Sequence, residues 1–206
     1  MYTAGYTSLH ACYPGRGFRW MQRGTEEAME YIPTAIGALY GVEVCRFVNC
    51  LPIQADKQSV PYGHLGSHPT NLALYLAHGG NLAWRLQQYA QLWVLLQTDQ
   101  MIHQDGRCLH SAYACRQGKH RSFAWSLVES AIFSRLGFEV RYENTCHWAQ
   151  QKSRCQRSNW PNGCERCGNC EDGFAGLSDD TMRVVDAYVQ EFFEVVLALE
   201  CVVNVS

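Results

Sequence analysis

The stretch CLHSAYACRQGKHRSFAWSLVESAIFSRLGFEVRYEN, residues 108–144, decides the fold. The apolar run 108–114 predicts a buried strand. Residues 121–137 carry apolar side chains at helical spacing and end in Gly137, which favours a helix with a glycine at its C-terminal end. Residues 138–144 alternate apolar and polar side chains as a strand does. A strand, a loop, a helix and a second strand predict an α/β fold with a mostly parallel sheet flanked by helices.

Segments on either side extend this unit into one domain. Residues 1–40 are predicted to be a lead-in segment, irregular over residues 1–30 with a short helix near residues 26–31, and residues 41–206 to be the α/β domain itself. Residues 41–52 predict a strand and residues 54–70 a long loop, since turn-forming Gly and Pro pairs recur there. Residues 70–97 predict two helical segments separated by a Gly-Gly pair.

The composition is that of a folded domain with an uneven distribution of charge. Of the 206 residues 47% are hydrophobic, which is enough for a full core, and this length is typical of one domain. The net charge is −2, but residues 107–157 carry nine Lys and Arg against three Asp and Glu, whereas residues 158–206 carry two against nine. The basic block favours a phosphorylated ligand or nucleic acid, and the acidic C-terminal part argues against a wholly basic nucleic-acid binder.

The sequence also predicts the compartment. No run of 18 apolar residues occurs, so we expect no membrane span, and residues 1–20 lack the apolar core of a secretory signal. The chain contains 11 cysteines, which without a leader favour metal binding over a disulfide scaffold. We expect an intracellular, reducing compartment, either cytoplasmic or organellar.

The loop between the predicted strand and helix has the features of an anion site. Backbone N–H groups and the positive end of the helix dipole are available there. Gly118 permits a tight turn, Lys119 and Arg121 bring positive charge, and a guanidinium can bind two phosphate oxygens. The predicted ligand-binding residues of this loop are Cys115, Arg116, Gln117, Gly118, Lys119, His120, Arg121 and Ser122.

The same loop resembles the C-x5-R-S/T signature of cysteine-dependent phosphatases. Cys115, Arg121 and Ser122 match it, which would make Cys115 a nucleophile and Arg121 the group that stabilises the transition state. Ala114 stands where those enzymes have His. The upstream candidates for a general acid, none of them in a recognisable motif, are Asp56, Asp99 and Asp105. A phosphatase is therefore an alternative, and a binding domain is favoured over an enzyme.

Taken together with the helix that follows, the loop resembles the C-terminal domain of the RapZ family of RNase adapter proteins. That family carries Gly-Cys-Thr-Gly-Gly-x-His-Arg-Ser-Val before a helix and a short strand. Residues 45–52, CRFVNCLP, resemble its Asp-Val-Arg-Phe-Leu-Pro-Asn-Pro segment with Arg46 as the matched residue, and residues 64–69, HLGSHP, resemble its Thr-Gly turn. The resemblance covers about residues 41–144, and the matched loop residues are Cys115, Gly118, His120, Arg121 and Ser122.

This resemblance implies binding of a phosphorylated amino sugar or a similar phosphate, and contact with RNA. It implies that Arg121, Lys119 and the backbone near Gly118 hold the phosphate, while His120 and Arg46 orient the rest of the ligand. The family's nucleotide-binding half is not matched, since no G-x-x-x-x-G-K-S/T motif occurs.

A cysteine-rich module is predicted at residues 146–171. The spacing C-x8-C-x2-C-x2-C suits a closed tetrahedral site for structural Zn²⁺, which would supply the folding energy of a loop-rich segment. Cys146 or His147 could replace one of the four ligands, and an iron–sulfur cluster and a metal-free module are further open alternatives. The predicted zinc ligands are Cys155, Cys164, Cys167 and Cys170.

A third function class concerns the C-terminal part of the chain. Residues 178–200 predict a long closing helix with Ser178 or Asp179 as its N-cap. In this alternative the chain is a structural or adapter subunit of a larger assembly, and the anion site is vestigial. The zinc module or the closing helix would then contact a protein partner.

Overall fold

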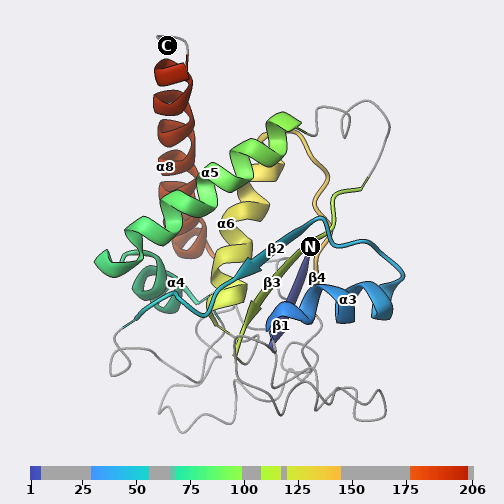
Figure 1. Cartoon of the computed structure of the whole chain (residues 1–206). Helices are drawn as coiled ribbons and strands as arrows, with labels where there is room; N and C mark the ends of the chain where they lie inside the picture. The colour runs from blue at the N-terminus through green and yellow to red at the C-terminus, as the bar shows by residue number, and fades with distance from the viewer. Residues whose placement is uncertain are drawn as a thin grey trace, which may run out of the picture.

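The computed structural model describes residues 1–5, 29–55, 66, 68–98, 108–116, 120–144 and 177–203 (Figure 1). Its strands form one sheet in the order β2-β3-β1-β4, and every pairing is parallel. The prediction of an α/β fold with a parallel sheet is therefore confirmed. The strands are β1 (Tyr2–Gly5), β2 (Arg46–Asn49), β3 (Ser111–Cys115) and β4 (Glu143–Asn144).

The helices follow the predicted pattern from residue 69 onward. The Gly79-Gly80 pair interrupts the helical region as expected, because a short 3₁₀ helix separates α4 from α5. Helix α8 confirms the predicted closing helix, and its N-terminus is capped by the Ser178 hydroxyl, which accepts a hydrogen bond from Thr181 N at 3.3 Å. The helices are α3 (Ile32–Tyr40), α4 (Pro69–Leu76), the 3₁₀ helix η3 (Gly79–Asn81), α5 (Leu82–Thr98), α6 (Arg121–Arg135) and α8 (Asp179–Val203).

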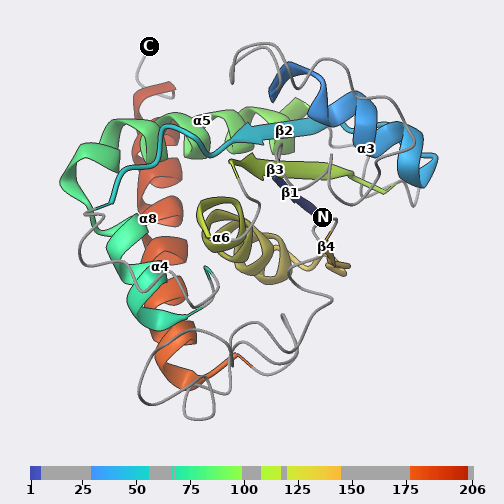
Figure 2. The same ribbon diagram turned by 90° about the horizontal axis from the view of Figure 1, so that it is seen from below.

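Alternate side chains of the inner strand β3 face two separate cores. Ala112 and Ala114 pack towards α3, while Tyr113 and Cys115 belong to the larger core formed with α4, α5, α6 and α8. Figure 2 shows α3 on one face of the sheet and α6 on the other, with α4 and α8 beyond α6. The fully buried Trp125 of α6 lies in the larger core.

The order of the strands explains why the helices are divided between the two faces. The β1–β2 connection, which contains α3, passes β3 in one direction, whereas the β2–β3 and β3–β4 connections run in the other direction. Right-handed crossovers that reverse direction must change face, so α5 and α6 lie opposite α3. Because the direction of the connections reverses, β1 and β3 are neighbouring strands, and the segments that follow them run to opposite faces of the sheet.

Helix α6 ends at a glycine motif that the sequence predicts. Gly137 has φ +87°, a left-handed conformation that L side chains rarely adopt. Gly137 N donates to Ser134 O and Phe138 N donates to Phe133 O, which is the Schellman pattern. The Phe133 and Phe138 rings meet edge to face with centroids 5.4 Å apart, so an apolar contact accompanies the turn.

Several predicted boundaries differ from the structure. The strand predicted over residues 41–52 is β2, Arg46–Asn49, and the strand predicted over residues 108–114 is β3, Ser111–Cys115. The prediction of an irregular segment over residues 1–30 misses β1, which is an inner strand of the sheet. Helix α3, which follows the short helix predicted near residues 26–31, packs on the sheet. The strand predicted over residues 138–144 pairs only at Glu143 and Asn144, because these two residues alone lie in register with Tyr2 and Thr3 of β1. None of the described helices is both long enough and apolar enough to cross a membrane.

Candidate anion-binding site

The predicted anion loop leaves the sheet at the point where the connections reverse. Cys115, the last residue of β3, is in register with Gly5, the last residue of β1. In open α/β sheets, ligands bind outside the carboxyl ends of two neighbouring strands whose connections run to opposite sides. The loop that joins β3 to α6 starts at this position, so topology places Cys115 at the preferred binding edge of the sheet.

The two ends of the loop are held together by side chains. The Cys115 sulfur lies 3.3 Å from the hydroxyl oxygen of Ser122, the second residue of α6. Cys115 is 3% exposed and Ser122 is fully buried, so this contact closes the base of the loop. A hydroxyl at this distance can donate to the sulfur or accept from it, which makes Ser122 a partner of the thiol as well as a residue of the first helical turn.

Arg121 is oriented by backbone carbonyl groups that follow β2. Its Nη1 donates to Leu51 O at 2.5 Å and to Ile53 O at 3.2 Å. Within the described part of the chain, neither Nε nor Nη2 of Arg121 makes a hydrogen bond, and no carboxylate pairs with this guanidinium. A half-buried guanidinium therefore keeps two of its nitrogen donors available at the carboxyl edge of the sheet.

The lack of a carboxylate partner among the described residues distinguishes Arg121 from most of the other described arginines. Five of them form ion pairs with carboxylates, two across the interior and three at the surface. Partial burial of a charge is costly unless a counter-ion compensates it. An anionic ligand beside Arg121 would therefore supply the counter-ion that the described residues do not provide. The paired arginines are Arg46, Arg85, Arg135, Arg141 and Arg183.

Gly66, which precedes α4, and Tyr75, near the end of α4, both pack against the start of α6. A Cβ atom placed on Gly66 would lie 2.0 Å from His120 O and 2.8 Å from Ala124 N, so the backbone of residue 66 touches the first turn of α6. The His120 ring, 9% exposed, stacks on Tyr75 of α4 with centroids 6.2 Å apart. The segment that resembles the RapZ family's Thr-Gly turn therefore reaches the anion loop through Gly66.

The structure describes only the two ends of the predicted loop. Arg116 is exposed directly after β3, whereas Gln117, Gly118 and Lys119 lie outside the described residues. Asp56, Asp99 and Asp105, the candidates for a general acid, also lie outside them. The predicted zinc ligands Cys155, Cys164, Cys167 and Cys170 lie outside them as well.

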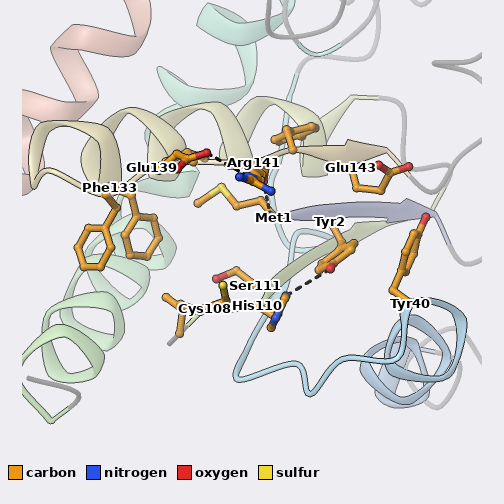
Figure 3. Close-up of a pocket in the computed structure, with 14 residues that line it drawn as sticks. Met1, Tyr2, Tyr40, Cys108, His110, Ser111, Phe133, Glu139, Arg141 and Glu143 are labelled. Atoms are coloured by element: carbon orange, nitrogen blue, oxygen red, sulfur yellow. Dashed lines mark hydrogen bonds and ion pairs between the residues drawn. The ribbon is translucent and has the colours of Figure 1, made fainter. Parts of the chain in front are cut away.

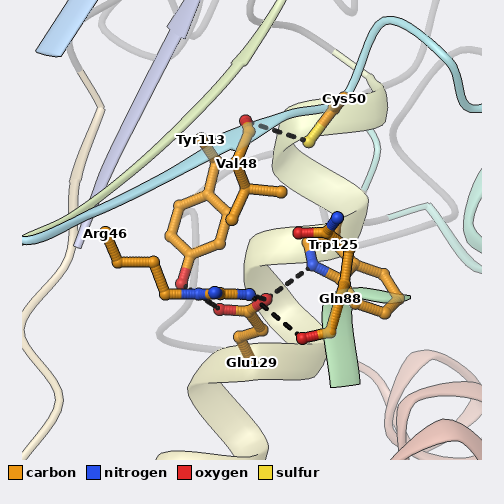
Figure 4. Close-up of polar contacts among 7 residues, drawn as sticks. All are labelled: Arg46, Val48, Cys50, Gln88, Tyr113, Trp125 and Glu129. Atoms are coloured by element: carbon orange, nitrogen blue, oxygen red, sulfur yellow. Dashed lines mark hydrogen bonds and ion pairs between the residues drawn. The ribbon is translucent and has the colours of Figure 1, made fainter. Parts of the chain in front are cut away.

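Arg46 occupies a different place from the one predicted. Its Nε and Nη2 donate to the two carboxylate oxygens of Glu129 at 2.9 and 2.7 Å, and its side chain is 6% exposed (Figure 4). Tyr113 and Trp125 donate to the same carboxylate at 2.8 and 2.7 Å. Arg46 begins β2, so it lies at the amino end of the sheet's strands, whereas the loop lies at their carboxyl end. This arrangement gives Arg46 a structural role in the core and removes it from the proposed ligand-binding set.

The buried ion pair also sets the protonation of its members. Burial acts to lower the pKa of Arg46, but the charge and hydrogen bonds of Glu129 outweigh burial and hold that pKa above its ordinary value. Burial, followed by the charge of Glu129, raises the pKa of Tyr113 well above its ordinary value of 10.0. The guanidinium stays charged and the phenol stays neutral, as the hydrogen bonds require.

A pocket of about 610 Å³ lies at the opposite edge of the sheet (Figure 3). It opens between residues 108–111 and 138–143, where β3 and β4 begin, and Tyr2 and Tyr40 line one end of it. The Tyr2 hydroxyl lies 3.2 Å from His110 Nδ1 at its wall. Because ligands of open parallel sheets bind outside the carboxyl ends, the edge near Arg121 is the stronger candidate despite this pocket.

Two features of the anion site have no simple sequence signal. The carbonyl groups of Leu51 and Ile53 hold Arg121, but any residue type supplies a carbonyl. In the sequence, Tyr75 cannot be told apart from the other apolar residues of its helix, so its contact with His120 is not predicted. The only available hint is the turn-rich segment around Gly66, which the resemblance indicates as part of the site.

Comparisons with known proteins leave the family open. No family model, no curated protein and no solved structure matches the chain. The similarity to the RapZ C-terminal domain thus remains a prediction based on the quoted motifs.

Proposed function

We propose that the chain binds a phosphate-bearing small molecule at the loop Cys115–Ser122. The observation that carries the proposal is Arg121, whose guanidinium is held by two backbone carbonyls and has no carboxylate partner among the described residues. Its free Nε and Nη2 can bind two phosphate oxygens, and the first turn of α6 presents backbone N–H groups to the same ligand. Arg121 and Ser122 are the described residues to which we assign this contact.

The resemblance to the RapZ C-terminal domain suggests a phosphorylated amino sugar as the ligand. Two of the segments that carry the resemblance contact the ends of the loop, since Leu51 binds Arg121 and Gly66 touches His120. This proximity supports a single site. RNA phosphate is the competing ligand, and a short single-stranded RNA belongs in the same titration series.

The proposal is tested by calorimetric titration with glucosamine 6-phosphate, using glucosamine as the control without phosphate. Arg121→Ala should weaken binding by about tenfold or more, the cost of losing charge-assisted hydrogen bonds. Arg135→Ala is the matched control, because Arg135 is on the same helix but is exposed and pairs with Asp186. Equal affinity of the wild type and Arg121→Ala would overturn the proposal.

The contact between Cys115 and Ser122 keeps a cysteine-dependent phosphatase as a second candidate. The Ser122 hydroxyl lies 3.3 Å from the sulfur and can donate a hydrogen bond to it. In this mechanism the Cys115 sulfur attacks phosphorus, the P–O bond to the leaving group breaks, and the leaving oxygen takes its proton from water. A second water then hydrolyses the S–P bond, which releases inorganic phosphate and restores the thiol. Hydrolysis of an aryl phosphate that disappears in Cys115→Ser favours the phosphatase, whereas undiminished phosphosugar binding by Cys115→Ser without hydrolysis favours the binding domain.

We also propose that Cys155, Cys164, Cys167 and Cys170 bind a structural Zn²⁺, on the basis of their spacing.

The alternative of an adapter subunit is supported by exposed apolar side chains on α8, where Leu197 is 61% exposed and Leu199 is 37% exposed. A shift in mass by light scattering between the wild type and Leu197→Glu would favour that alternative.

A further inference from the structure

Two cysteines lie side by side at the anion site. Asn49 of β2 is in register with Ala114 of β3, and the ladder continues for one more residue because Cys50 N donates to Ala114 O at 2.8 Å. Cys50 is therefore the neighbour of Cys115 across two parallel strands. Adjacent strands lie about 4.8 Å apart. This spacing falls within the range of about 4.4–6.8 Å between Cα atoms that a disulfide requires.

Both thiols point to the same face of the sheet. Cys50 and Cys115 belong to one core cluster together with Val48 and Tyr113, which are two residues earlier on their respective strands. Successive strand residues alternate between faces, so residues two apart share one face. Neither cysteine is part of a disulfide. Burial raises the pKa of Cys50 well above its ordinary value of 9.0, and the next largest cause is the charge of Cys115, as expected for close neighbours.

The two cysteines are also connected to Ser122 and Arg121, the residues to which we assign the contact with the ligand. The Cys115 sulfur contacts the Ser122 hydroxyl, and Cys50 directly precedes Leu51, whose carbonyl holds Arg121. A bond between the two sulfurs would draw Cys115 from Ser122 and displace the start of the segment that orients Arg121. Formation of a disulfide would therefore disturb the phosphate site without any change in charge at Arg121.

We propose that Cys50 and Cys115 form a peroxide-reactive dithiol whose oxidation weakens anion binding. Cys115, at the base of the loop and 3% exposed, reacts first, while Cys50 is fully buried. The Cys115 thiolate attacks one peroxide oxygen, the O–O bond breaks, and the sulfenic acid and a hydroxide form, with the sulfur oxidised and the peroxide reduced. The Cys50 thiol then condenses with the sulfenic acid, so that the S–S bond forms and water leaves. The effect on binding rests on the proposed phosphate function, whereas formation of the disulfide does not.

The first test uses the full chain treated with hydrogen peroxide, blocked with iodoacetamide and digested without reduction. We expect a peptide that joins Cys50 to Cys115, absent after treatment with dithiothreitol and absent in Cys50→Ala. Cys45→Ser and Cys108→Ser, which remove exposed thiols, are matched controls and should retain the cross-link. If Cys50→Ala does not fold, Cys50→Ser and Cys115→Ser replace it. Peroxide-treated wild type in which Cys50 stays alkylatable while Cys115 is oxidised to the sulfinic acid overturns the inference.

The second test measures glucosamine 6-phosphate binding before and after oxidation. Oxidised wild type should bind about tenfold more weakly, the loss of about one charge-assisted hydrogen bond, and dithiothreitol should restore the affinity. Cys50→Ser cannot form the disulfide, so any loss of affinity in this variant after peroxide should match the fraction of Cys115 that mass spectrometry finds oxidised to the sulfinic acid. A cross-link in a protein whose reduced form binds no phosphate supports the thiol pair and refutes the proposed function. Phosphate binding without any cross-link supports the proposed function and refutes the thiol pair.

Discussion

Arg46 and Glu129, 83 residues apart in the sequence, form a two-point ion pair in the core between β2 and α6. Glu129 is fully buried and also accepts hydrogen bonds from Tyr113 and Trp125. The four side chains connect two neighbouring strands with the helix that follows the anion loop. The direction of α6 relative to the sheet, and with it the position of Arg121, depends on this network.

Substitution of Glu129 by glutamine should destabilise the protein strongly. The Arg46 guanidinium would keep its charge in the core without a counter-ion, which typically costs about 3–5 kcal/mol. Urea unfolding followed by tryptophan fluorescence measures this change in the free energy of unfolding. Glu139→Gln is the control, because its pair with Arg141 is exposed at both ends and should contribute less than about 1 kcal/mol. Similar losses for both variants would contradict a structural role of the network.

The parallel sheet could be predicted because its central unit carries strong signals. The buried run before Cys115, the helical spacing after Arg121 and the glycine at 137 each have a direct physical meaning, and the structure reproduces all three. Strand β1 could not be predicted in the same way. Tyr2–Gly5 is four residues long and contains a glycine, so its sequence carries no periodicity, and it becomes a strand only because β3 and β4 lie on either side of it.

The anion site was predictable where it consists of side chains and unpredictable where it consists of backbone. The spacing of Cys115, Arg121 and Ser122 placed them in one loop, and the sulfur–hydroxyl contact agrees with that placement. The prediction that Arg46 orients the ligand rests on one matched residue of a resembling segment. A sequence motif does not reveal that an acidic residue on a helix, Glu129, is the partner of that arginine, since the pairing depends on long-range packing.

Stability should fall at high pH because of buried tyrosines. Burial raises the pKa of Tyr113 and of Tyr89 above the ordinary value of 10.0, in each case assisted by a nearby carboxylate. A raised pKa in the folded state favours the neutral phenol, so its contribution to stability is complete below about pH 10. Above that pH the unfolded chain loses the phenolic protons while the folded chain retains them.

Each such tyrosine should lower the free energy of unfolding by about 1.4 kcal/mol per pH unit above its unfolded pKa. Tyr113→Phe removes one of these protons, so the slope of stability against pH between about pH 10.5 and 11.5 should become shallower by that amount. Urea unfolding at several pH values gives the slope, which does not depend on the constant loss of the hydrogen bond to Glu129. Identical slopes for wild type and Tyr113→Phe would show that this phenol ionises in the folded protein.

The zinc proposal predicts a fixed metal content. Purified protein should contain about one Zn²⁺ per chain, and Cys164→Ser should lower both the zinc content and the melting temperature, because metal binding supplies folding energy. Cys201→Ser removes an exposed cysteine outside the predicted module and should change neither quantity. Zinc content measured by inductively coupled plasma mass spectrometry and equal in both variants would contradict the assignment.

Addition of a side chain at Gly66 should destabilise the protein and weaken the anion site. An alanine Cβ would meet His120 O at 2.0 Å and Ala124 N at 2.8 Å, and these backbone atoms in the first turn of α6 cannot move independently of the helix. We expect Gly66→Ala to lower the free energy of unfolding by about 1–3 kcal/mol, as overpacking does. It should also weaken phosphosugar binding, because the start of α6 and Arg121 must shift together. Gly79→Ala, whose Cβ has no heavy atom within 4 Å, should change stability by less than about 0.5 kcal/mol and leave binding intact. A Gly66→Ala variant with the stability and affinity of Gly79→Ala would separate residue 66 from the site.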